Sequence, residues 1–305
     1  MFERILVPLD GSSRAEVILT QVARLLRLKD SEIILCQSSH VPLDFHTTRT
    51  AAIDARMQAD ATSYLDGVAR RLSDQGARVR VRVGNGSPAE MILDIAANEG
   101  ATMIAMSTHG RSGVARWIMG SVAEKVVRAS TVPVLLVRSF RRSPQGDLHP
   151  AVAQELAFQR ILVPVDGSPA STAAVEPALK FGKLAGAEMR VLHVRPMVIP
   201  PSPILPGMVA GAPIVPLPTL PPEENPVVTA VADRFRASGL KVLHDSVEGD
   251  PAAEILDRSA TQGVDLIVMG THGRSGVSRW LTGSVAERVL RESTVPLLLV
   301  RSPTP

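Results

Sequence analysis

The sequence has little cysteine, little net charge and no long apolar run. Its only cysteine, Cys36, excludes an intrachain disulfide or a metal site built from cysteines, and a single thiol fits a reducing cytoplasm. Lys and Arg total 33 against 30 Asp and Glu, so the formal charge of +3 is too small to indicate a nucleic-acid or anionic-membrane surface. No run of about 18 apolar residues occurs, and the first residues lack the basic and apolar stretches of a secretory signal. We therefore expect a cytoplasmic protein without a nucleic-acid or membrane partner.

The sequence contains an internal repeat. Residues 3–13 return at 159–169 with an offset of 156, and residues 107–138 return at 270–301 with an offset of 163 and 24 of 32 positions identical. A chain of 305 residues is long enough for two ordinary domains of about 150 residues each. Self-similarity over this period predicts two tandem domains, here called the first repeat and the second repeat.

The expected domains are residues 1–140 and 157–303, joined by a linker at 141–156. The second repeat gains seven residues within 195–226, where 11 prolines exclude a regular helix or a central strand. This proline-rich insert could bind a partner or act as a lid, and a poorly ordered loop fits its composition equally well. The matching region of the first repeat, roughly 50–75, has the pattern of a helix.

Short apolar runs alternate with longer segments of helical period in both repeats. Several runs are apolar on successive residues, which is typical of strands covered by helices on both faces of a parallel sheet. The sequence therefore predicts an α/β fold of two tandem doubly wound domains, each with a five-stranded parallel sheet flanked by helices. The expected strands are Ile5–Leu9, Glu32–Cys36, Val79–Val83, Thr102–Met106 and Val132–Val137, then Ile161–Val165, Met189–Val194, Val242–Val247, Leu266–Met269 and Val295–Val300.

A glycine-bearing loop follows the fourth expected strand of each repeat. In the second repeat Gly270 and Gly273 are followed after nine residues by Gly283-Ser284, which open a helix. Glycines let backbone amides approach an anion, and a helix N-terminus offers free N–H groups, so phosphate is the natural ligand. Ser284 and Glu287, like Ser121 and Glu124, also have the spacing of a capping box. A cap needs only its own few residues, so repetition of the whole block favours the phosphate interpretation.

This loop resembles the nucleotide loop of the ATP-binding universal stress protein family, and the chain resembles a tandem two-domain member. The resemblance covers nearly the whole chain, and it implies an adenine nucleotide alpha hydrolase-like fold, bound ATP and accompanying Mg²⁺. The first repeat has Ser107 in place of the first glycine, whereas Gly110, Gly120 and Ser121 match. If that glycine needs a positive φ or lies against the ribose, a serine there costs about 1 kcal/mol.

A carboxylate ends the first expected strand of each repeat, as Asp10 and Asp166. In an Asp-Gly-Ser segment such a residue can simply form a turn or cap a helix. The resemblance instead places it at the ribose and adenine, and places the backbone at Ser38 and Val194 against adenine. The candidate nucleotide-binding residues are Pro8, Asp10, Ser38, Ser107, Gly110, Arg111, Gly113, Gly120, Ser121 and Val122 in the first repeat, and Pro164, Asp166, Val194, Gly270, Gly273, Arg274, Gly276, Gly283, Ser284 and Val285 in the second. No catalytic residue or protein metal ligand is predicted.

Several loop residues have two interpretations. The arginines could neutralise phosphate charge or be solvated, the histidines are structural or line the ligand, and the tryptophans pack the loop or cover the site. These residues are Arg111, Arg116, Arg274, Arg279, His109, His272, Trp117 and Trp280. Cys36 is expected to be a small buried hydrophobe.

Three classes of function are compatible with these patterns. The first is a nucleotide-dependent regulator of stress response that binds ATP and acts through an unknown protein partner, as the resemblance implies. The second is an enzyme, at most a slow ATPase or a nucleotidyl-transfer relative, although the Walker loop and a general base at motif spacing are absent from the sequence. The third is a dimerisation module without nucleotide. The final strands of the repeats could pair as an intrachain pseudo-dimer, and the resemblance makes further homo-oligomers plausible.

Overall fold

The computed structural model describes residues 2–39, 51–108, 119–138, 140–142, 148–150, 158–196, 225–271 and 284–302. The first repeat contains β1 (Arg4–Pro8), α1 (Ser13–Glu16), α2 (Ile18–Leu28), β2 (Glu32–Ser38), α3 (Ala51–Ser73), β3 (Arg78–Gly84), α4 (Pro88–Asn98), β4 (Met103–Ser107), α5 (Ser121–Ala129) and β5 (Val134–Val137). The second contains β8 (Arg160–Pro164), α6 (Pro169–Ala185), β9 (Glu188–Arg195), α7 (Pro226–Ala237), β10 (Val242–Glu248), α8 (Pro251–Thr261), β11 (Leu266–Gly270), α9 (Ser284–Glu292) and β12 (Leu297–Val300).

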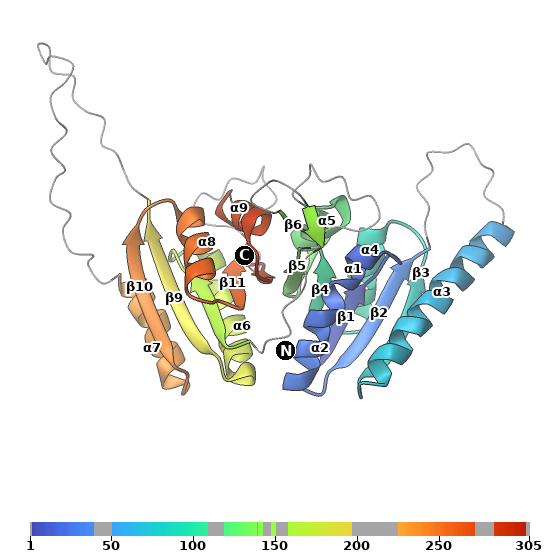
Figure 1. Ribbon diagram of the computed structural model, residues 1–305, viewed down its shortest axis with the longest axis horizontal. Helices are drawn as coiled ribbons and strands as arrows, with labels where there is room; N and C mark the ends of the chain where they lie inside the picture. The colour runs from blue at the N-terminus through green and yellow to red at the C-terminus, as the bar shows by residue number, and fades with distance from the viewer. Residues whose placement is uncertain are drawn as a thin grey trace, which may run out of the picture.

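The described strands of both repeats join in one continuous sheet (Figure 1). Its order is β10-β9-β8-β11-β12-β5-β4-β1-β2-β3, and all neighbours are parallel except β5 and β12. Those two strands run antiparallel, with Leu135 opposite Leu298. Each repeat is therefore a five-stranded parallel sheet, as predicted, and the expected pairing of the two final strands is confirmed.

Helices cover both faces of this sheet, and each face has a core that runs through both repeats (Figure 1). One core includes residues of α2, α3, α6 and α7, and the other includes residues of α4, α5, α8 and α9. The central strands β4, β5, β11 and β12 are buried along their whole length, which explains their continuous apolar runs.

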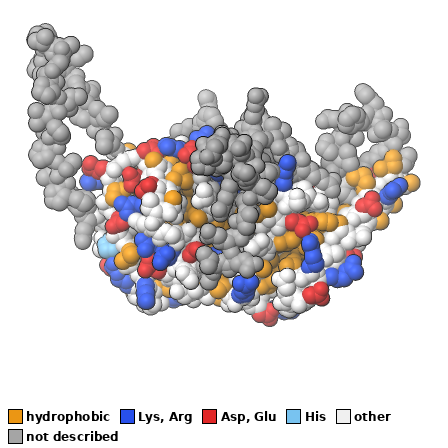
Figure 2. Space-filling model, viewed as in Figure 1, with side chains coloured by type: hydrophobic (Ala, Val, Ile, Leu, Met, Phe, Trp, Pro, Cys, Tyr) orange, Lys and Arg blue, Asp and Glu red, His pale blue; other side chains and the backbone are white. Residues whose placement is uncertain are grey.

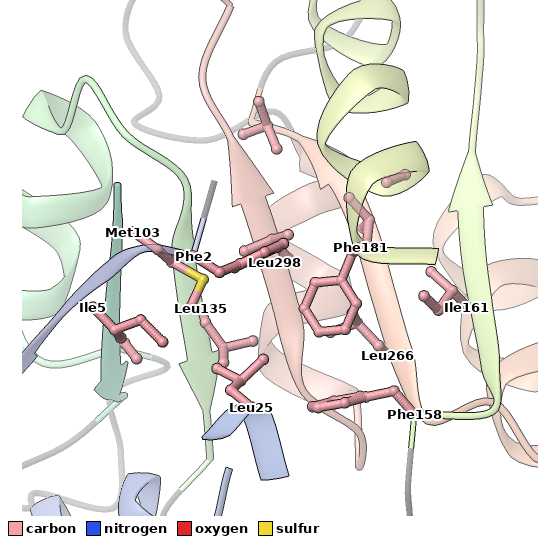
Figure 3. Close-up of a cluster of buried hydrophobic side chains, with 14 of the residues drawn as sticks. Phe2, Ile5, Leu25, Met103, Leu135, Phe158, Ile161, Phe181, Leu266 and Leu298 are labelled. Atoms are coloured by element: carbon pink, nitrogen blue, oxygen red, sulfur yellow. The ribbon is translucent and has the colours of Figure 1, made fainter. Parts of the chain in front are cut away.

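Aromatic side chains fill the seam between the repeats on the face of α2 and α6 (Figure 3). Phe181 of α6 makes edge contacts with Phe2, at 5.1 Å between ring centres, and with Phe158, at 4.9 Å. Leu25 and Leu298 lie in the same cluster. Because residues of both repeats pack together here, the seam is part of the hydrophobic core.

Several sequence-based boundaries need correction. The strands predicted from Val132 and Val295 begin two residues later, since Pro133 and Pro296 have no N–H and the preceding Ser130 and Ser293 side chains bond to the valines. Two short paired strands, β6 (Phe140–Arg142) and β7 (Leu148–Pro150), occupy the start of the expected linker 141–156, and β6 begins one residue before it.

The structure also tests the expected bounds of the proline-rich insert and of the helix at 50–75. The proline-rich insert 195–226 is narrower than predicted, because Arg195 ends β9 and Pro226 begins α7, where a first-turn proline is tolerated. Residues 197–224 lie outside the described part of the chain. The helix expected at 50–75 is present as α3. Among the described helices, none is both long and apolar enough to cross a membrane.

Charged side chains of both signs are interspersed over the face shown in Figure 2. This agrees with the small net charge of +3.

Candidate functional site

The predicted site residues that the structure describes lie at the ends of strands or at the start of helices, where the chain reverses its winding direction. In the first repeat β1 lies between β2 and β4, and in the second β8 lies between β9 and β11. Parallel strands end at one edge, so the carboxyl ends of β1 and β4 lie side by side, and so do those of β8 and β11. A crevice for ligands is expected at such a point in an open parallel sheet.

The loop after the first strand of each repeat is a tight turn held by its aspartate. Asp10 Oδ1 accepts bonds from the backbone N–H and the hydroxyl of Ser12, at 2.9 and 2.6 Å. Asp166 Oδ1 accepts from the backbone N–H of Ser168 at 2.9 Å, and both serines then cap the following helix. The turn role that the sequence allowed for these aspartates is therefore present. Both carboxylates stay partly exposed, which leaves them accessible to a ligand.

The second strand of each repeat supports this loop from the side. Leu9 N–H donates to the Cys36 carbonyl, and Val165 N–H donates to the Leu192 carbonyl, each at 2.8 Å. Pro8 and Pro164 end the first strands beside Cys36 and Leu192. Cys36 itself is fully buried, and burial raises the pKa of its thiol, so the predicted structural role is confirmed.

The two residues expected to face adenine differ in environment. Ser38 ends β2 and donates its hydroxyl to the carbonyl of Gly86 at 2.9 Å. Val194, at the matching position of β9, is buried in the core. The two side chains therefore differ in polarity, and the expected contact of the backbone with adenine stays a prediction.

Backbone hydrogen bonds join the end of β4 to the start of α5. Thr108 N–H donates to the Val137 carbonyl at 2.9 Å, and the Thr108 carbonyl accepts from Gly120 N–H at 2.8 Å. These bonds place the N-terminus of α5 at the carboxyl edge of the sheet, beside the predicted site. In the second repeat Thr271 N–H makes the matching bond to the Val300 carbonyl at 3.0 Å. Sequence reasoning missed both threonines, although they lie within the repeated block.

The capping box that the spacing of Ser121 and Glu124 allowed is not formed. Gly120 is the N-cap of α5 and no side chain caps this helix among the described residues. Ser121 is therefore the first helical residue, and its side chain is exposed, as is that of Ser284 at the start of α9. Val122 and Val285 pack partly against the core. The first-turn amides of α5 thus lack the side-chain acceptor that a capping box would have supplied.

The structure explains why residue 270 is a glycine, which the sequence did not reveal. Its φ is not in the left-handed region, unlike that of Gly11 or Gly167 in the aspartate turns. A Cβ built at Gly270 would lie 2.5 Å from the carbonyl carbon of Ala170 in α6, and closer still to its oxygen. The positive φ suggested for this glycine is therefore wrong, and close packing of α6 on the end of β11 requires it instead.

Tyr64 and Glu16 are further polar residues near the first aspartate turn. The Tyr64 hydroxyl donates to Glu16 Oε1 at 2.9 Å, and Arg71 pairs with the other carboxylate oxygen at 2.8 Å. Burial raises the pKa of Tyr64, and the charges of Glu16 and Asp10 add to this effect. This network ties α1 to α3, and no sequence motif indicated it.

The remaining predicted residues lie outside the described ranges. They are Gly110, Arg111, Gly113, Gly273, Arg274, Gly276 and Gly283, together with His109, His272, Arg116, Arg279, Trp117 and Trp280. Two cavities are lined by described residues, one of about 670 Å³ between α2 and α3 and one of about 370 Å³ beside β9 and β10. Neither is lined by a predicted nucleotide-binding residue.

Comparisons with known proteins agree with the repeated fold. The sequence profile of the universal stress protein family matches residues 1–138 and 157–301. A universal stress protein of Mycolicibacterium smegmatis is 26% identical over 311 residues, covering 97% of this chain and 96% of that protein. Universal stress protein MJ0531 of Methanocaldococcus jannaschii is 33% identical over 149 residues, which cover 49% of this chain and 85% of that protein.

The fold also matches a solved structure along nearly its whole length. The crystal structure of a universal stress protein from Archaeoglobus fulgidus has a TM-score of 0.71 and 22% sequence identity, covering 98% of this chain and 96% of that one. The chain therefore belongs to the universal stress protein family.

Proposed function

We propose that this chain binds ATP at the carboxyl edge of each repeat, with Mg²⁺ arriving with the nucleotide. In this proposal the nucleotide state controls association with a regulatory partner in a stress response. The observation that carries it is the N-terminus of α5, which lies beside the end of β4 without a side-chain cap among the described residues. The proposed domains are residues 1–140 and 157–303, joined by the segment 141–156.

The phosphates would bind at the helix N-terminus. The first-turn N–H groups of α5 and the positive end of its dipole favour an anion, and Gly120 presents no Cβ toward it. The exposed hydroxyl of Ser121 offers a further donor. Ser284 has the same place at the start of α9, in the repeat that contains the complete glycine pattern.

The ribose and the base would lie toward the first and second strands. Asp10 and Asp166 are partly exposed carboxylates that can accept hydrogen bonds from hydroxyl or amino groups. Each is fixed by the bonds to the serine that follows it, so little conformational entropy is lost when a ligand binds. The resemblance to ATP-binding family members supports the same assignment, residue by residue.

Nucleotide binding can be tested on the full chain. We expect mass spectrometry after gentle isolation to detect copurified adenine nucleotide, and calorimetry on the stripped protein to detect ATP binding. Incubation with ATP should release ADP at no more than a slow rate. A stripped protein that binds no ATP would refute the proposal, and turnover well above background would favour an enzyme.

The glycine loops themselves can be tested by matched substitutions. Gly283→Val and Gly120→Val each place a branched side chain where phosphate is expected to approach. We expect Gly283→Val to remove more ATP, because the second repeat has the complete pattern. Bound nucleotide per chain is the measurement, and equal retention of ATP by the two variants would refute the loop assignment.

A further inference from the structure

His193 is a buried polar side chain of the second repeat that has no part in the proposed contacts with ATP. It lies near the end of β9, directly before Val194, and is only 5% exposed. Its Nδ1 lies 2.9 Å from the carbonyl oxygen of Val165. Because a carbonyl oxygen can only accept, Nδ1 carries the proton and donates to Val165.

This bond fixes the residue that comes directly before Asp166. The N–H of Val165 donates to the Leu192 carbonyl at 2.8 Å, and the carbonyl of Val165 accepts from His193. Neighbouring residues of β9 therefore bind both backbone polar groups of Val165. The Val165 carbonyl and the Asp166 N–H belong to one planar peptide group, so the bond from His193 also orients the start of the aspartate turn.

The same peptide group is held at its other end by Ser171 of α6. The N–H of Asp166 donates to Ser171 Oγ at 3.3 Å, and the Ser171 hydroxyl donates to the Ser168 carbonyl at 3.1 Å. Ser171 is buried, as is His193, so both contacts are shielded from water. The peptide group between Val165 and Asp166 thus has one partner from β9 and one from α6.

The first repeat lacks both of these partners. The offset of 156 matches His193 to Gln37 and Ser171 to Ala15, which has no hydroxyl. Gln37 is also buried, but its Oε1 has no hydrogen-bond partner in the described part of the chain. The imidazole that orients the turn in the second repeat is therefore replaced by an amide whose buried oxygen is unsatisfied.

The two repeats consequently hold their aspartates by different means. In the first repeat the Ser12 hydroxyl donates to Asp10 Oδ1 at 2.6 Å, at the carboxylate itself. In the second repeat His193 and Ser171 act on the peptide group that precedes Asp166. Fixing a residue before its ligand arrives reduces the entropy lost on binding, and buried supporting contacts are an effective way to do so.

From this arrangement we infer that His193 is a positioning residue of the second-repeat nucleotide site. It holds the peptide group before Asp166, so that the carboxylate meets the hydroxyl or amino groups of the nucleotide in a fixed orientation. The inference rests on the proposed function, which assigns Asp166 to the nucleotide. It makes the second site dependent on a side chain of β9, whereas the first site does not depend on Gln37.

Calorimetric titration of ATP into variants of the full chain tests this role. His193→Leu removes the donor, and we expect the ATP affinity of one site to fall about fivefold because the Val165 carbonyl is no longer held. His193→Asn places an amide N–H at about the position of Nδ1, so it should bind ATP within about twofold of the unmodified chain. Rescue by Asn separates positioning of the turn from simple filling of the core, since Leu fills the space equally well.

Gln37→Leu is the matched control in the first repeat, where the oxygen that it removes has no partner in the described ranges. Both ATP affinities should stay unchanged. If the unmodified chain binds ATP but His193→Leu binds it equally well, or His193→Asn does not restore the loss, the role of His193 is overturned while the proposed function stands. An unmodified chain that binds no ATP refutes the proposed function itself, and the inference with it.

Discussion

The two repeats differ at the place where the helix that follows the first strand packs near the end of the fourth strand. In the second repeat α6 is one continuous helix, and its residue Ala170 approaches Gly270 so closely that no side chain fits there. In the first repeat the corresponding helix is divided at Val17 into α1 and α2, and Ser107 occupies the position of the glycine. The first glycine of the loop pattern therefore has a packing role in the second repeat, in addition to the place beside the nucleotide that the family resemblance implies.

A second difference lies at the opposite edge of the sheet. In the first repeat Thr102 Oγ1 accepts the N–H of Arg4, whereas in the second Asp265 accepts the N–H groups of Gln159 and Arg160. Glu3, which matches Gln159, pairs instead with Lys29 at 2.7 Å. The start of the first strand is therefore bonded to the same position in both repeats, but the charged side chains at the equivalent positions differ.

The largest effect is expected from Gly270→Ser. The added Cβ would overlap the backbone of Ala170, so α6 must shift, at a cost of about 1–3 kcal/mol in the free energy of unfolding. The reverse change in the other repeat, Ser107→Gly, adds no atoms and should cost less. Chemical denaturation of the full chain measures both, and a Gly270→Ser variant as stable as Ser107→Gly would contradict the packing explanation.

A smaller effect is expected from Glu3→Gln, which makes the first repeat resemble the second at this position. The bond from Lys29 lowers the pKa of Glu3 from 4.5 to about 2. A depressed carboxyl pKa stabilises the fold above the unfolded value and loses that contribution as the pH falls toward 2. Because Glu3 is half exposed, the contribution should be below about 1 kcal/mol.

The pH dependence of unfolding measures this contribution. Between about pH 4.5 and 2, the unmodified chain should lose stability more steeply than Glu3→Gln. Equal slopes for the two proteins would show that the Glu3–Lys29 pair contributes nothing.

Much of the fold follows directly from the sequence, because strands buried on both faces produce apolar runs that are easily recognised. The repeat also indicated that the two final strands could pair. The division of the helix at Val17 and the short strands β6 and β7 depend on local packing that no periodicity reveals. The capping box that the sequence allowed at Ser121 is not formed, because Gly120 takes the N-cap position.

The candidate site could be predicted only in part. The aspartates and the glycine loops stand out because they recur at fixed offsets, and the structure brings Asp10, Thr108 and the start of α5 to one edge of the sheet. The packing role of Gly270 and the buried threonines could not be predicted, because both depend on contacts between segments far apart in the sequence.

The most direct test of the proposed ATP site is a calorimetric titration of ATP into the unmodified chain, Ser284→Asn and Ser284→Asp. An aspartate at the first position of α9 is compatible with the helix dipole, so the fold should be retained, while its charge repels phosphate. We predict that ATP binds to the unmodified chain and to Ser284→Asn, and that Ser284→Asp weakens binding at the second repeat at least about tenfold. Identical titrations of the two variants, or no binding of ATP to the unmodified chain, would contradict the account.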